Sequence, residues 1–323
     1  MASLSELARR LAALSVCALG ALSVAGCRDG RFDRLADSGP ASPSGTIFAS
    51  ENWAIWPMPN AARGLPHAQS FDAQSSGVVL DRVTGLSWQQ HPDAQQLTFA
   101  DATQHCAALS LAGFDDWRLP SRLELISILD TTRTQPSINV AAFPDTPSDW
   151  FWSSTPSASD AQSAWYLYFY FGYPKTDLVS NRFSVRCVRT AEPKHPPPTA
   201  HYDVKPDTVR DLGTGLTWQR AVPESLLAFD SAQAYCADLA LAGKSGWRVP
   251  SLPELLTLID ERAKDPPMID RLAFPDTPGE AFWSSSYFGG VAGQSWQVYF
   301  DHGHGLYGLP STPFRVRCVT ALP

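Results

Sequence analysis

The sequence predicts an α+β protein of two tandem domains, each with two helices between its first and its later strands. Three observations support this fold class. The chain of 323 residues contains an internal repeat whose period is far too long for a solenoid unit. Each copy has apolar residues at helical spacing in its first half and aromatic or β-branched runs in its second half. Hydrophobic residues make up 44% and charged residues 18%, which is typical of a globular protein.

The repeat is carried by the same short motifs in the same order. The hexapeptide TGLSWQ at Thr84–Gln89 returns as TGLTWQ at Thr214–Gln219. Both copies also contain LAG, Trp-Arg-x-Pro-Ser-x-x-Glu-Leu, FPDTP, FWSS and VRCV. These matches predict a first domain at residues 51–190 and a second domain at residues 206–323.

Two segments lie outside the repeat. Residues 191–205 contain a run of prolines, typical of a semi-rigid extended linker, so we expect the two domains to unfold largely independently. The segment WAIWPMPN at Trp53–Asn60 has no second copy. We expect it to pack on the first domain as an extra strand or arm.

Within each copy the predicted order is strand, helix, helix, strands. In the first copy, residues 77–90 predict a hairpin that turns near Thr84–Gly85. Apolar residues at helical spacing predict a helix from about Phe99 that stops at Gly113, and residues 121–130 predict a second helix. The strands that follow are predicted from three aromatic or β-branched runs, FWSST, AWYLYFYFG and FSVRCVRT.

The longest shared phrase is DDWRLPSRLELISILD at Asp115–Asp130, which returns as SGWRVPSLPELLTLID at Ser245–Asp260. It is either a duplicated reaction centre or a structural joint that every copy of the fold requires. Ser-x-x-Glu before an apolar run is a helix capping box, and the tryptophan can fill the approach to it, so the sequence favours the joint. The arginine either clamps strand carbonyls or faces a ligand, and we predict the clamp. The residues of this structural motif are Trp117, Arg118, Ser121, Glu124, Trp247, Arg248, Ser251 and Glu254.

The N-terminal segment has the features of a bacterial lipoprotein signal. Arg9 and Arg10 precede an apolar run too short to span a bilayer comfortably, and the run ends in LSVAGC. We predict a signal peptide at residues 1–26, lipidation of Cys27 and a flexible tether at residues 27–50. The predicted location is the bacterial cell envelope, lipid-anchored at the outer membrane or cell surface. The alternative is an ordinary secretory signal with a chance cysteine.

Four cysteines remain after Cys17 and Cys27 are set aside, and four cysteines allow three pairings. Each copy has one early and one late cysteine at equivalent positions. The repeat therefore predicts the disulfides Cys106–Cys187 and Cys236–Cys318. Free thiols in a reducing compartment are the alternative, and the export signal argues against them.

The charge balance excludes one class of partner. The chain has 25 basic and 32 acidic residues, spread evenly, and neither half has a basic stripe. We therefore expect no nucleic-acid partner. The same balance argues against a purely electrostatic grip on polyanionic sugars.

The ordered set Gly-Leu-x-Trp, a helix with Cys, Trp-Arg-x-Pro-Ser-x-x-Glu-Leu, Phe-Trp-Ser-Ser and Val-Arg-Cys-Val resembles the Lcl C-terminal-domain family, in both copies and along almost their whole length. The resemblance implies a C-type-lectin-like fold for each domain, with two helices flanking twisted antiparallel sheets and the chain ends close together. It also implies a disulfide from the first helix to the last strand. Family members include a bacterial surface adhesin that binds sulfated polysaccharides. The calcium-dependent sugar motifs of C-type lectins have no match here beyond QPS at Gln135–Ser137.

An enzymatic alternative comes from a second resemblance. WRLPSRLEL is similar to a segment of formylglycine-generating enzymes, which oxidise a target cysteine with their own reactive cysteine pair. The predicted disulfides use both cysteines of each domain, so we predict no catalytic residue. The DHGHG turn at Asp301–Gly305 has no metal-ligating counterpart in the first copy, and we interpret it as a polar turn. The sequence thus predicts no metal, no cofactor and no enzymatic activity.

The two copies differ most in the loops that follow the second helix, and loops on a rigid scaffold commonly carry binding specificity. The favoured function is a surface binding or adhesion module, with carbohydrate as the candidate ligand. The alternative is a structural or assembly protein of the envelope with only protein partners. The membrane is contacted through the lipid anchor alone. The candidate ligand-binding residues are Tyr170, Tyr173, Tyr287, Phe288 and Tyr307.

Overall fold

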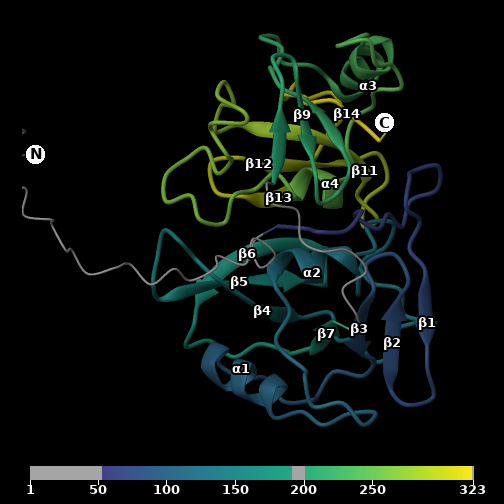
Figure 1. Ribbon diagram of the computed structural model, residues 1–323, viewed down its shortest axis with the longest axis vertical. Coiled ribbons are helices and arrows are strands. Elements are labelled where there is room, and N and C mark those ends of the chain that lie inside the picture. Colours follow the sequence, from purple (N-terminus) through teal and green to yellow (C-terminus); the bar gives the residue numbers. More distant parts are fainter. Residues whose placement is uncertain (1–52, 191–200, 322–323) are drawn as a thin grey trace, which may run out of the picture. The chain divides into compact units, whose positions relative to one another are not determined.

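A computed structural model describes residues 53–190 and 201–321, and its element order follows the repeat (Figure 1). The signal segment, the tether, Cys27 and most of the proline-rich linker lie outside the described residues. Each repeat has two short helices among antiparallel strands, so the protein is more sheet-rich than the predicted α+β class. Among the described residues, no helix has the length and apolar character needed to cross a membrane.

The elements of the first repeat are β1 (Phe71–Ala73), β2 (Val78–Asp81), β3 (Leu86–Gln89), α1 (Phe99–Ala107), α2 (Arg122–Ser127), β4 (Trp150–Pro156), β5 (Ser163–Tyr168), β6 (Tyr173–Leu178) and β7 (Val188–Thr190). Those of the second repeat are β8 (Tyr202–Val204), β9 (Thr208–Asp211), β10 (Thr217–Gln219), α3 (Phe229–Asp238), α4 (Leu252–Leu256), β11 (Ala281–Tyr287), β12 (Ser295–Tyr299), β13 (His304–Gly308) and β14 (Val319–Thr320).

Each repeat contains two antiparallel sheets of the same design. In the first repeat the sheets have the orders β1-β2-β3-β7 and β4-β5-β6, and in the second β8-β9-β10-β14 and β11-β12-β13. The predicted hairpin is confirmed as β2 and β3, and Gly85 takes the positive φ of 78° that the turn requires. Because β7 pairs with β3, the last strand of the repeat lies next to the β2–β3 hairpin.

The first helix ends earlier than the sequence predicted. Thr98 caps its start by accepting a hydrogen bond from the Asp101 amide, but α1 stops at Ala107. Gly113 belongs instead to a separate tight turn closed by the bridge between Leu111 and Phe114, where its φ is +81°. The glycine therefore marks that turn, and not the end of the helix.

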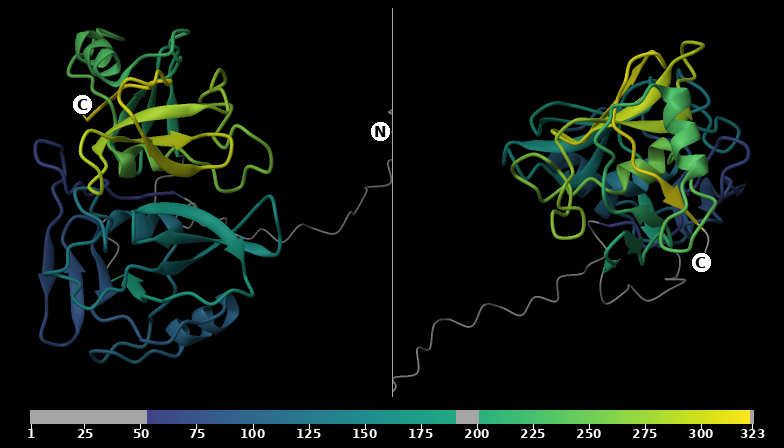
Figure 2. Two further views of the ribbon diagram at one scale, coloured as in Figure 1. Left: turned by 180° about the vertical axis from the view of Figure 1, so that it is seen from behind. Right: turned by 90° about the horizontal axis from the view of Figure 1, so that it is seen from above.

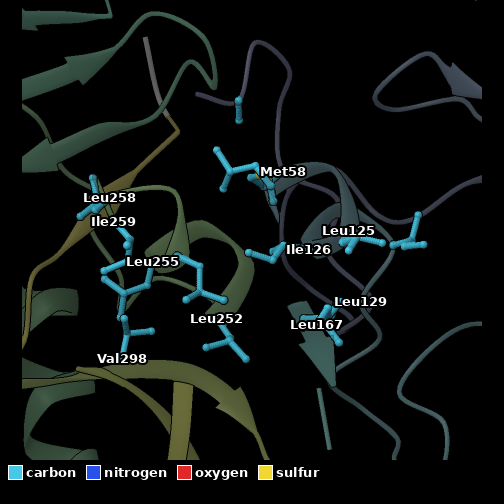
Figure 3. Close-up of a cluster of buried hydrophobic side chains, with 14 of the residues drawn as sticks. Met58, Leu125, Ile126, Leu129, Leu167, Leu252, Leu255, Leu258, Ile259 and Val298 are labelled. Atoms are coloured by element: carbon cyan, nitrogen blue, oxygen red, sulfur yellow. The ribbon is translucent and has the colours of Figure 1, made fainter. Parts of the chain in front are cut away.

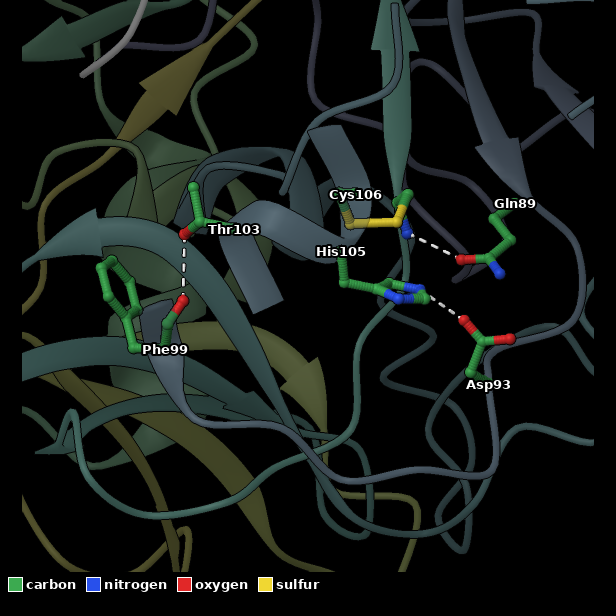
Figure 4. Close-up of a disulfide and its surroundings, with 7 residues drawn as sticks. Gln89, Asp93, Phe99, Thr103, His105 and Cys106 are labelled. Atoms are coloured by element: carbon green, nitrogen blue, oxygen red, sulfur yellow. Dashed lines mark hydrogen bonds and ion pairs between the residues drawn. A yellow bond between two sulfur atoms is a disulfide. The ribbon is translucent and has the colours of Figure 1, made fainter. Parts of the chain in front are cut away.

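Both predicted disulfides are confirmed. Cys106 in α1 is bonded to Cys187, and Cys236 in α3 is bonded to Cys318. Figure 4 shows the first of them, where Gln89 accepts a hydrogen bond from the Cys187 amide at 3.1 Å. Close by, His105 of α1 forms an ion pair with Asp93, which connects the helix to the loop before it. Within the helix, the Thr103 hydroxyl donates to the Phe99 carbonyl.

The two repeats share one hydrophobic core. Buried side chains from both belong to a single cluster, in which Leu125 and Ile126 of α2 accompany Leu252 and Leu255 of α4 (Figure 3). The edge strands β6 and β13 also lie side by side (Figures 1 and 2). This shared core argues against independent unfolding of the domains, because separating them would expose it to water.

A buried ion pair joins the repeats within this core. The Arg122 Nε atom donates to Glu261 Oε1 at 2.5 Å, and the two side chains are 1% and 2% exposed. Arg122 also donates to the carbonyl oxygens of Leu256 and Ile259, and its guanidinium lies 5.2 Å from the centre of the Trp165 ring. Burial raises the pKa of Glu261, although the charge of Arg122 opposes the rise.

The arm at Trp53–Asn60 packs on the second repeat as well, which corrects the expectation that it belongs to the first repeat alone. The Trp53 ring stacks on His201 with centroids 4.0 Å apart, and Arg262 lies 5.0 Å above the same ring. Asn60 donates from Nδ2 to the Pro66 carbonyl at 2.9 Å and to Glu254 Oε1 at 3.5 Å. The arm thus contacts the backbone that follows it and side chains of the second repeat.

Candidate functional site

The duplicated phrase forms a helix-capping joint in both repeats. Ser121 accepts from the Glu124 amide while Glu124 accepts from the Ser121 amide, and Ser251 and Glu254 do the same. Trp117 and Trp247 are each 2% exposed, and their indoles donate to nearby carbonyls. The phrase therefore presents no exposed tryptophan to a ligand.

The arginine of this phrase has a different partner from the one predicted. Arg118 donates from both terminal nitrogens to the Glu124 carboxylate at 2.7 and 2.5 Å, and Arg248 does so to Glu254 at 2.7 and 2.6 Å. A forked pair of this kind locks the capping glutamate in place. The arginine thus holds the capping glutamate, and Arg248 also donates from Nη1 to the neighbouring Val249 carbonyl at 3.4 Å.

The carbonyl clamp is made by the arginines of the VRCV motif, which sequence reasoning missed. Arg186 donates from Nη1 to the carbonyls of Gln89 and Gln90, both at 2.6 Å, and Arg317 donates to the equivalent carbonyls of the second repeat. Both arginines are completely buried, and burial lowers the pKa of each to about 9. The sequence feature that could have identified these two arginines is a charged residue inside an otherwise apolar motif.

Four of the five candidate ligand-binding residues lie in one continuous row of rings, which we call the aromatic belt. The row runs from Trp150 to Tyr168 (5.3 Å between centroids), Tyr170 (5.7 Å) and Phe171 (4.6 Å). It continues into the second repeat, because Phe171 lies 5.8 Å from Phe288 and 6.0 Å from Tyr307. Tyr173 joins the belt beside Tyr168 at 5.7 Å.

The belt is accessible to different degrees along its length. Trp150 is 39% exposed and Tyr307 36%, whereas Phe288 is 4% exposed and stacks on Tyr307 with an interplanar angle of 3°. Tyr168, Tyr170, Phe171 and Tyr173 are half-buried. Phe288 therefore supports the belt from beneath, and a ligand would meet mainly the other rings.

The fifth candidate, Tyr287, lies outside the belt. It is 59% exposed, and its ring centroid lies 5.6 Å from that of Phe229. Sequence reasoning missed Trp150 and Tyr168, because they belong to strands that looked like core. Their position on one face was available from the strand register, since Trp150 is directly opposite Tyr168 and Tyr168 opposite Tyr173.

A polar edge borders the belt at Trp150. Gln96 donates from its side-chain amide to Asp149 Oδ2 at 2.5 Å, and Asp149 Oδ1 accepts from the Trp150 amide at 2.8 Å. Burial, followed by the neighbouring Tyr170 and the Asp149 charge, raises the pKa of Tyr168, so its phenol remains a proton donor at neutral pH. This end of the belt combines an exposed ring with hydrogen-bonding groups.

A small cleft of about 120 Å³ opens beside the β6–β13 seam. Its lining includes Trp165 and Thr176 of the first repeat with His302 and His304 of the second. Burial lowers the pKa of His304 to about 3 and also lowers that of His302, so both imidazoles are neutral at pH 7. Within the described residues, no group of His, Cys, Asp and Glu side chains has an arrangement able to hold a metal ion.

Comparison with known proteins identifies both repeats. The family model described as the Lcl C-terminal domain matches residues 77–189 and 207–320. A search of curated proteins found no match to the chain.

Proposed function

Because the chain belongs to the Lcl C-terminal domain family, with two copies of its domain, we propose that it acts as a non-enzymatic binding or adhesion protein of the bacterial cell envelope. A signal peptide would export it, and lipid on Cys27 would hold it at the outer membrane or cell surface. Carbohydrate is the proposed ligand. We also infer a C-type-lectin-like fold for each repeat, supported by the disulfide from the first helix to the end of the repeat and by the pairing of the last strand with β3 in the first repeat.

The aromatic belt is the observation that carries this proposal. Rings from two repeats that share one core form a single row, and Trp150 and Tyr307 present more than a third of their surface to solvent. Exposed aromatic side chains are costly to leave unpartnered and are frequent at recognition sites. The four described cysteines are all in disulfides, which supports a binding role over a cysteine-based oxidase.

The test is a glycan array probed with the full-length chain in detergent. Binding of a glycan by the wild-type chain, weakened by Tyr307→Ala, is the expected result. Tyr287→Ala is the matched control, because this tyrosine is exposed in the same repeat but lies outside the belt. A wild-type chain that binds no glycan would refute the carbohydrate proposal.

A structural or assembly role with protein partners is the second candidate. Most of the large apolar side chains that the described residues expose belong to the second repeat, including Leu272 at 88% and Leu309 at 57% exposure. Such residues are common in protein interfaces. Cross-linking in intact cells would favour this role if one envelope protein were captured by the wild type and lost with Leu309→Asp.

A further inference from the structure

Each belt position can be compared with its counterpart in the other repeat, and the Trp150 end shows the clearest difference. The shared motifs align Trp150 with Ala281, Asp149 with Glu280 and Gln96 with Leu226. The first repeat therefore has an indole, a carboxylate and an amide where the second has a methyl group, a carboxylate and an alkyl chain.

In the second repeat, the Glu280 carboxylate is already engaged in an ion pair. Arg315 donates from Nε to Glu280 Oε2 at 2.8 Å. The counterpart of Arg315 in the first repeat is Ser184, which carries no charge. Among the described residues Asp149 has no ion-pair partner, and its side chain accepts only from Gln96 and the Trp150 amide. A carboxylate has about four lone-pair sites, so this one retains acceptor capacity.

The geometry points to a sugar-binding subsite at Asp149, Trp150, Tyr168 and Gln96, and we propose that it takes an uncharged sugar unit of a polysaccharide. This inference rests on the carbohydrate function proposed above. The Trp150 ring would pack against the apolar face of the sugar ring, as aromatic rings do with flat apolar partners. Asp149 and the Gln96 amide would accept from and donate to sugar hydroxyls, forming charge-assisted hydrogen bonds through the carboxylate.

The charge of Asp149 decides between sugar classes. A sulfate or carboxylate group placed within about 4 Å of it would be repelled, and more strongly near a protein surface than in bulk water. The cation closest to the subsite in the hydrogen-bond network is Arg182, which donates to the Gln96 carbonyl at 3.3 Å and leaves Asp149 unpaired. The subsite therefore favours neutral sugars over sulfated ones.

The rest of the belt extends the subsite into a track. Tyr168, Tyr170 and Phe171 lead from Trp150 to Tyr307 in the second repeat without a break. A row of this many rings would contact several units of a sugar chain, and not a single sugar. The buried Arg122–Glu261 pair keeps the two ends of the track on one scaffold.

The experiment measures binding of the full-length chain to immobilised neutral glucan, mannan and chitin oligosaccharides and to heparin oligosaccharides. We expect binding to at least one neutral chain. Trp150→Ala should weaken it at least about tenfold, as truncation of a central aromatic contact does. Asp149→Asn, which keeps the shape and the hydrogen bond to the Trp150 amide, should weaken it severalfold. Tyr299→Ala, at the counterpart of Tyr168 in the second repeat, is the matched control and should change nothing.

The outcomes separate this inference from the function on which it rests. Neutral-glycan binding that Trp150→Ala and Asp149→Asn leave unchanged would overturn the subsite and leave the carbohydrate function standing. Binding to heparin alone would overturn the assignment of sugar class. No binding to any probe would overturn both. Circular dichroism of each variant shows whether it is folded. If Trp150→Ala fails to fold, the isosteric Asp149→Asn still decides the test.

Discussion

The ion pair between the repeats gives the sharpest test of their coupling. Arg122 corresponds to Leu252 in the other repeat, and Glu261 corresponds to Thr131, so each position has a natural substitute in the same fold. Arg122→Leu removes the partner of a carboxylate that is 2% exposed. Breaking one side of a buried pair costs about 3–5 kcal/mol, because the remaining charge stays buried without compensation.

The double variant Arg122→Leu/Glu261→Thr removes both charges. It should be closer to wild type than Arg122→Leu alone, since replacing a whole buried pair is often nearly neutral. Glu261→Thr alone should cost less than Arg122→Leu, because the guanidinium keeps the Leu256 and Ile259 carbonyls as acceptors. Urea unfolding of the full-length chain, followed by tryptophan fluorescence, gives the free energy of unfolding for all four proteins.

The loss of stability caused by Arg122→Leu should depend on pH. Burial raises the folded-state pKa of Glu261, so protonation favours the folded state, and loss of Arg122 should raise that pKa further. The deficit of Arg122→Leu should therefore be largest at neutral pH and shrink as pH falls toward the ordinary glutamate value of 4.5. Single-variant costs that add within about 0.5 kcal/mol, or two separate unfolding transitions in the wild type, would refute the coupling.

Three further predictions concern the caps, the core and the anchor. Trp117→Ala and Trp247→Ala should each lower the free energy of unfolding by about 3–5 kcal/mol, measured by urea unfolding, because each tryptophan fills a packed core. Glu254→Gln should destabilise at neutral pH: burial opposes ionisation, but the hydrogen bonds and charge of Arg248 outweigh it and lower the pKa of Glu254. That stabilisation is present above pH 4.5 and is lost as pH falls through the lowered pKa, so unfolding curves of wild type and variant should converge in acid. Cys27→Ala should move the protein into the aqueous phase of a detergent phase separation, and continued detergent partitioning would place the anchor elsewhere.

The sequence predicted the features that both copies repeat. The hairpin, the two capping boxes and the disulfides each left the same residues at equivalent positions, such as Ser121 with Glu124 and Ser251 with Glu254. A duplicated pattern reports a shared local structure, because both copies must satisfy the same backbone groups. The location in the envelope and the ligand stay predictions.

The contacts between the two repeats are made by residues that the two copies do not share, so the repeat pattern did not predict them. Arg122 and Glu261 have uncharged counterparts, so comparison of the copies gave no reason to pair them. Trp53 has no counterpart, and its contact with His201 depends on how the repeats pack. The carbonyl clamp was assigned to Arg118 because sequence spacing does not tell which of two arginines near a strand points inward; burial selects Arg186. Long-range packing decided each of these cases.

The charges of the buried pair also determine which repeats can join. Arg122 is supplied by one repeat and Glu261 by the other, so the contact has a donor side and an acceptor side. A first repeat meeting a second copy of itself in the same geometry would bring Arg122 against Thr131, and two second repeats would bring Glu261 against Leu252. Each like pairing would bury a charge without its partner. The pair thus favours the joining of one repeat to the other kind over the joining of two like repeats.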